Sequence, residues 1–183
     1  IAYVPGRKPP VELGRLVDDM AVIAQLREDV SEVRKVDRPE PRDAARCLAD
    51  AKALASQIGG VTGRQTSSVV FISYPAAQEM SIDCNFHKPS IFISWPNRAK
   101  PSPPTVQLIA KSGRVLTGAS EETVKSLLAA CVVEALKPES NELANHEIDG
   151  VRTECQAFSR DGGAGSVTIL RRFGPYPALA ARP

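Results

Sequence analysis

The stretch "MSIDCNFHKPSIFISW" (residues 80–95) decides the fold class. Apolar and polar residues alternate on both sides of the short segment "HKP". A period of two, interrupted by a proline-containing turn, is typical of two antiparallel strands joined as a hairpin. We therefore expect strands over residues 80–86 and 90–95, with Cys84 facing inward and His87 in the turn.

Strand patterns extend from this hairpin in both directions. Residues 68–74 ("SVVFISY") are apolar on both faces, as expected of a central strand. Toward the C-terminus, "TVQLIA" and "RVLTG" are predicted as strands around the turn "KSG", and "GVRTECQAFS" and "SVTILRRF" as a hairpin around "RDGGAG". The polar segments "TGRQTSS" (62–68) and "NHEID" (145–149) are predicted as connections.

Two helices, each with one apolar face, accompany these strands. Residues 43–58 have apolar side chains at helical spacing, and residues 120–137 begin at Ser120, a good N-cap. The strands come in blocks joined by short turns, which is typical of an α+β fold. We expect a mainly antiparallel sheet of about five to seven strands with these two core helices on one face, plus an N-terminal helix.

The chain divides into four segments. Residues 1–36 hold a leader and a helix with a heptad-like apolar stripe, which either packs on the domain or forms a stalk. Residues 37–43 are a proline-rich linker, residues 44–174 a single α+β domain, and residues 175–183 a loose tail. The first residue is Ile1, which favours removal of a signal peptide or an upstream anchor, although trimming alone would also explain it.

Composition argues against several function classes. The 183 residues are 43% hydrophobic and 24% charged, as in ordinary globular proteins. Lys and Arg number 23 and Asp and Glu 21, so no basic surface for nucleic acid is expected. The longest apolar runs fall short of the ~18 residues of a membrane-spanning helix, so no such segment is expected in this chain.

The four cysteines lie on predicted inward faces, two on the core helices and two on strands. None of them forms a C-x-x-C pair, which argues against a zinc site. If the chain is exported, Cys47–Cys131 and Cys84–Cys155 are the first choice among three connectivities, pairing helix with helix and strand with strand. Four buried free thiols are the alternative, and they would indicate the cytoplasm.

Catalytic and cofactor motifs do not stand out in the sequence. It contains neither H-E-x-x-H nor G-x-S-x-G, and "GGVTGRQTS" lacks the lysine of a phosphate-binding loop. Cys84 lies close to His87 in the sequence, but it is predicted to face the core while the histidine lies beyond the strand end. We therefore expect no cofactor, no metal and no cysteine nucleophile.

The best candidate binding surface is the segment "WPNRAKPSPP" (95–104). Trp95, Arg98 and Lys100 lie on this proline-stiffened stretch, which loses little entropy on binding. His87, in the hairpin turn, is a further exposed candidate. The alternation from Ile91 leaves a second interpretation open, in which Trp95 is a buried strand residue.

These observations favour a non-catalytic extracytoplasmic domain. Such a domain, periplasmic or secreted and typical of a bacterial envelope, would bind an unidentified protein or small ligand. One alternative is a small hydrolase-like enzyme whose site leaves no sequence signature. Another is a membrane-anchored oligomerisation module, in which the N-terminal helix forms a homo-oligomer.

Overall fold

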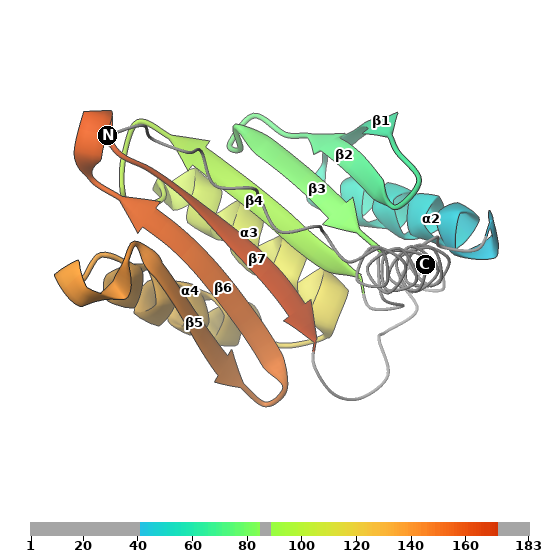
Figure 1. Ribbon diagram of the computed structural model, residues 1–183. Coiled ribbons are helices and arrows are strands. Elements are labelled where there is room, and N and C mark those ends of the chain that lie inside the picture. Colours follow the sequence, from blue (N-terminus) through green and yellow to red (C-terminus); the bar gives the residue numbers. More distant parts are fainter. Residues whose placement is uncertain (1–40, 85–88, 172–183) are drawn as a thin grey trace, which may run out of the picture. The chain divides into compact units, whose positions relative to one another are not determined.

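In the part of the chain that the structure describes, seven strands form one sheet in which every neighbouring pair is antiparallel (Figure 1). The computed structural model describes residues 41–84 and 89–171, all of which belong to one compact unit. The strands are β1 (Val61–Gln65), β2 (Val69–Ser73), β3 (Glu79–Asp83), β4 (Ser90–Pro96), β5 (Leu143–Ile148), β6 (Val151–Phe158) and β7 (Ala164–Arg171). Their order, β1-β2-β3-β4-β7-β6-β5, joins two meanders where β4 lies beside β7.

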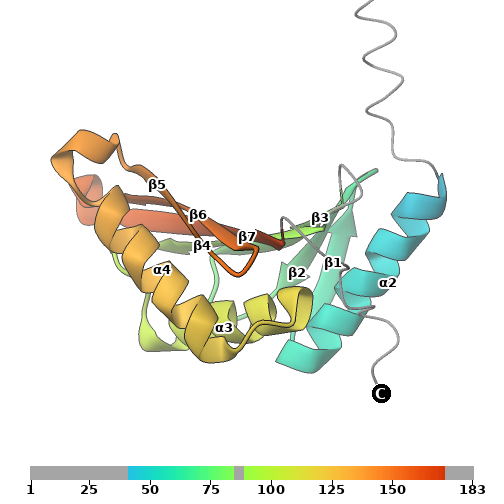
Figure 2. The ribbon, with the colours of Figure 1, turned by 90° about the horizontal axis from the view of Figure 1, so that it is seen from below.

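Within the described residues, three α-helices cover one face of this sheet (Figure 2). They are α2 (Pro41–Ile58), α3 (Pro103–Thr117) and α4 (Glu121–Ala135). Helix α2 contacts β1 and β2, α3 contacts β4 and β7, and α4 contacts β5 and β6. The expected α+β fold with core helices on one face is therefore confirmed. The helix expected within residues 1–36 lies outside the described residues.

The helix-facing side of the sheet and the helices together form the hydrophobic core. Alternate side chains of β4, those of Ile91, Ile93 and Trp95, are buried there. Ile91 and Ile93 pair with Ile169 and Val167 of β7, which are buried on the same side. The alternation that predicted the hairpin thus places the apolar side chains of β4 under the helices.

Helix α3 contradicts the expectation of two strands around the turn "KSG". Ser102 caps the helix, and prolines occupy its first two positions, where a missing N–H is tolerated. Gly113 lies inside the helix because a Cβ there would come within 2.7 Å of Val124 Cγ1 on α4. This glycine permits close packing of two helices and does not form a turn.

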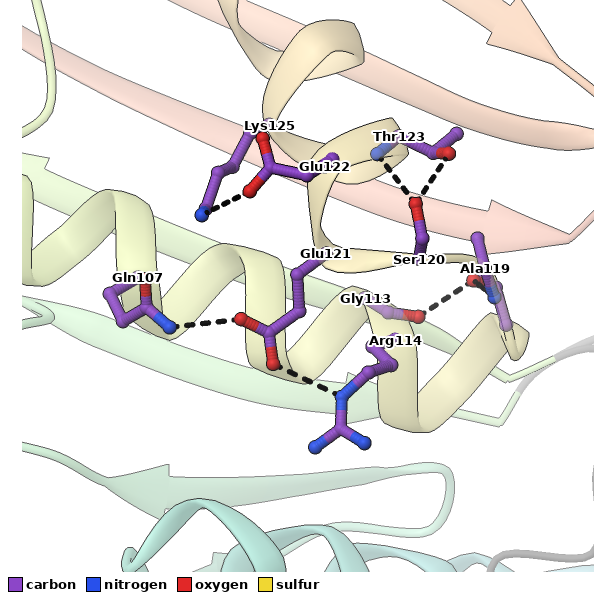
Figure 3. A network of polar contacts seen from close by, with 10 residues as sticks. Gln107, Gly113, Arg114, Ala119, Ser120, Glu121, Glu122, Thr123 and Lys125 are labelled. Carbon is purple, nitrogen blue, oxygen red and sulfur yellow. Dashed lines mark hydrogen bonds and ion pairs between the residues drawn. The ribbon is translucent and has the colours of Figure 1, made fainter.

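Polar contacts tie α3 to the start of α4 (Figure 3). Gln107 Nε2 donates to Glu121 Oε2 at 2.9 Å, and Arg114 Nε lies 3.1 Å from Glu121 Oε1. As predicted, Ser120 caps α4, its Oγ accepting from the Thr123 N–H at 3.0 Å. One carboxylate in the first turn of α4 therefore binds two positions along α3.

Both edge strands were expected to be connections, and this expectation is wrong. The segments that form β1 and β5 are polar and mostly exposed, so they carry little of the apolar alternation that marks an inner strand. Each edge strand pairs on one side only, β1 with β2 and β5 with β6. Their structure depends on the neighbouring strand more than on their own side chains.

The disulfides are Cys47–Cys84 and Cys131–Cys155, and no described cysteine is free. The absence of free thiols agrees with the predicted oxidised state, but the predicted connectivity is wrong. Helices α2 and α4 pack over opposite halves of the sheet, so Cys47 meets Cys84, just past the end of β3, and Cys131 meets Cys155 on β6. The Cα atoms are 5.7 and 5.8 Å apart, within the usual range for a disulfide.

Candidate functional site

A cleft of about 470 Å³ lies between the β2–β3 turn, the end of β4 and the start of α3. Its volume is within the range of small-molecule sites, roughly 300–1,000 Å³. We call it the Trp95 cleft. It is lined by Pro75, Ala76, Ala77, Gln78, Trp95, Pro96, Arg98, Ser102, Pro104 and Thr105.

Trp95 is buried, with 2% of its surface exposed. Its interpretation as a core strand residue is therefore confirmed, although it also lines the cleft. The indole lies against Gly165, its direct partner on β7, where a Cβ would come within 2.6 Å of Cε2. The indole Nε1 is buried and has no hydrogen-bond partner among the described residues. This Nε1 atom lies on the β7 side of the ring, 2.9 Å from where a Cβ of Gly165 would stand, so the part of Trp95 that lines the cleft is its apolar ring.

One wall of the cleft is held by three hydrogen bonds at the start of α3. Thr105 Oγ1 donates to the carbonyl of Ala76 at 2.8 Å, across 29 residues of sequence. Because that hydroxyl has one proton, the Ser102 hydroxyl donates in the 2.8 Å contact with Thr105 Oγ1. Ser102 Oγ also accepts from the Thr105 N–H at 3.3 Å. The β2–β3 turn is thus attached to the helix.

The helix N-terminus itself has no N–H left for a ligand. Pro103 and Pro104 have none, and the N–H groups of Thr105 and Val106 bind Ser102. The exposed side-chain donors that remain in the lining are those of Arg98 and Gln78. Their arrangement favours a ligand that accepts hydrogen bonds.

The charge of the cleft comes from Arg98. Its side chain is exposed, and no ion pair or hydrogen bond of it occurs within the described part of the chain. No Asp or Glu belongs to the lining. The cleft therefore combines one cation with largely apolar walls of proline, alanine and tryptophan.

Removing the cap at this wall should destabilise the domain measurably. Ser102→Ala deletes the acceptor of the Thr105 N–H, and we expect it to lower the free energy of unfolding by about 1 kcal/mol. Urea unfolding would measure this loss. Ser126→Ala, on an exposed position within α4, is the matched control and should leave the free energy nearly unchanged. Equal stability of Ser102→Ala and the wild type would contradict this account of the cap.

The structure brings together some of the predicted binding residues and separates others. Trp95 and Arg98 line one cleft, whereas Lys100 lines a different hollow of about 270 Å³ between α3 and α4. His87 lies outside the described residues. Sequence reasoning missed Gln78 and Thr105, which reach the cleft from a distant turn and from a helix that was predicted as strand.

Other site types are not found in the described part of the chain. Within residues 41–84 and 89–171, no group of three or more His, Cys, Asp or Glu side chains could hold a metal ion. No helix in the same ranges has the length and apolarity needed to cross a membrane. No family model, curated protein or solved structure matches the chain. Chemical evidence for function therefore comes from the Trp95 cleft and the two disulfides.

Proposed function

We propose that this protein is a non-catalytic, extracytoplasmic globular domain that binds a ligand or a partner protein through the Trp95 cleft. The observation that carries the proposal is the donor set of the cleft. The Arg98 guanidinium, which has no partner among the described residues, and the side-chain amide of Gln78 line one hollow that has no Asp or Glu in its lining. Both groups are complementary to an anionic oxygen.

The rest of the lining indicates what that anionic group is attached to. The prolines and alanines of the cleft, together with the indole, form a mainly apolar surface. An apolar group bearing a carboxylate would use both parts of this surface. A guanidinium binds a carboxylate with two parallel hydrogen bonds, and such charge-assisted bonds contribute about 1.5–3 kcal/mol.

The extracytoplasmic location is supported by the two disulfides. Disulfides persist in oxidising compartments, whereas reducing systems keep most cytosolic thiols free. Each bond connects a helix to the sheet beneath it, so both hold the two layers of the domain together. Such a domain suits the periplasm or the exterior of a cell.

Hexanoate is a suitable probe of the cleft, with hexanol as its uncharged counterpart. Trp95 is the sole tryptophan, so its fluorescence and its indole N–H resonance report on this cleft alone. We expect hexanoate to shift both signals saturably. Hexanol should bind at least about tenfold more weakly, which corresponds to the loss of about 1.4 kcal/mol.

Arg98→Ala should weaken hexanoate binding by about tenfold or more, since it removes the cation. Lys52→Ala is the matched control because it removes an exposed cation of α2 that does not line the cleft. That variant should bind hexanoate like the wild type. Equal affinity of wild type and Arg98→Ala, or no saturable signal at all, would contradict the proposal.

A further inference from the structure

Strand β5 forms one edge of the sheet and exposes apolar side chains. The order of strands places no described strand beyond it (Figure 1). Leu143 and Ile148, at its two ends, are 60% and 43% exposed. It pairs with β6 through all six of its residues without a bulge. A regular edge strand with exposed apolar side chains at both ends is a template for pairing with another chain.

The opposite edge, β1, is protected in the ways usual for sheet edges. Its register shifts between Thr62 and Gln65, and Gly63 lies within that irregular stretch. Strand β1 also has a charged side chain, that of Arg64, whose guanidinium lies 4.4 Å from the ring centroid of Phe71 on β2. Strand β5 has no lysine, proline or glycine and no bulge. The two edges therefore differ in their capacity to pair.

We infer that β5 is a homodimer interface, in which two copies of this chain pair β5 with β5 antiparallel about a two-fold axis. This inference is independent of the ligand proposed for the Trp95 cleft. The pairing continues the all-antiparallel sheet across the axis, and the edges that remain are the two protected β1 strands. A two-fold contact of this kind closes on itself and leaves no further β5 edge to pair.

The side chains of β5 are self-complementary when the axis passes through His146. Ala144 then lies opposite Ile148 of the second copy. Ala144, His146 and Ile148 alternate along the strand and share a face of the sheet. The small alanine leaves room for the larger isoleucine, so the exposed surface of Ile148 becomes buried. This cross-strand pair occurs twice in the dimer.

The backbone of β5 also has groups available for this pairing. The carbonyl of Glu142 accepts from the Ala157 N–H, and bonded and non-bonded pairs alternate along an antiparallel ladder. Continuing this alternation, the backbone N–H groups of Ala144 and His146 point toward β6. The backbone N–H groups of Leu143 and Asn145 point toward the free edge. Proline at position 145 would therefore remove an outward donor and leave the β5–β6 hydrogen bonds in place.

Sedimentation velocity of the whole chain tests this inference. Over about 10 to 500 µM, we expect the average mass to rise from 19.6 kDa toward twice that value. Asn145→Pro should raise the dimer dissociation constant at least about tenfold, whereas Asn145→Ala, which keeps the N–H, should change it little. Exchange of the Asn145 amide should slow as wild-type concentration rises, which a dimer formed through another surface would not cause.

A second pair of variants covers the case in which Asn145→Pro does not fold. Ile148→Lys should weaken the dimer at least about tenfold, and Val61→Lys, at the 68%-exposed position on the opposite edge, should not. A wild-type chain that stays monomeric throughout the range would overturn the inference. So would a dimer that both Asn145→Pro and Ile148→Lys leave unchanged.

Discussion

Reducing both disulfides should lower the free energy of unfolding by about 7 kcal/mol. The bonds close loops between cysteines 37 and 24 residues apart. In the chain-entropy model, such loops contribute about 3.8 and about 3.4 kcal/mol respectively. Because small domains are stable by only about 5–15 kcal/mol, the reduced protein should be close to unfolding or unfolded at room temperature.

Urea unfolding with and without a thiol reductant, followed by the fluorescence of Trp95, measures this loss. The variants Cys47→Ser/Cys84→Ser and Cys131→Ser/Cys155→Ser separate the two contributions. Peptide mapping without reduction should recover Cys47 linked to Cys84 and Cys131 linked to Cys155. An unfolding midpoint that does not move on reduction, or a different connectivity, would contradict the account of how the helices are attached to the sheet.

Trp95→Ala should be the most destabilising single substitution in β4. It leaves a cavity beneath α3 where a 2%-exposed indole packs, and burial of this kind contributes about 3–5 kcal/mol. We expect the free energy of unfolding to fall by that amount, measured by urea denaturation and circular dichroism. Trp95→Phe keeps a ring in the core and should cost less.

The contact of Trp95 with Gly165 gives a sharper form of this prediction. Gly165→Ala places a methyl group within 2.6 Å of the indole Cε2, so the ring must move, at a cost of about 1–3 kcal/mol. In a Trp95→Leu background the same substitution should cost less, because no ring lies over position 165. Identical costs in the two backgrounds would show that the two residues are not coupled.

These stability effects decide which variants can test binding at the Trp95 cleft. Trp95 is buried, so we expect its replacement to change the stability of the core as well as the cleft. Arg98 is exposed and has no partner within the described part of the chain, so its replacement changes the charge of the cleft without opening the core. Binding is therefore best measured on Arg98 variants, with Trp95 kept as the reporter.

Features with a local periodicity were determined by the sequence alone. The β3–β4 hairpin, the β6–β7 hairpin and the helices α2 and α4 were all predicted, because alternate or three-to-four spacing of apolar residues defines one buried face. The same alternation placed Trp95 with Ile91 and Ile93, as the structure confirms. The oxidised state of the cysteines was also expected, from their inward positions.

Tertiary structure alone decided the features that depend on contacts between distant segments. Gly113 has the local appearance of a turn, and only the close approach of Val124 explains it inside α3. Strands β1 and β5 exist because β2 and β6 supply their hydrogen-bond partners. Disulfide connectivity follows from which half of the sheet each helix covers, and the Trp95 cleft from the bond between Thr105 and Ala76. Spacing along a chain determines which side of an element is buried, but not which other element buries it.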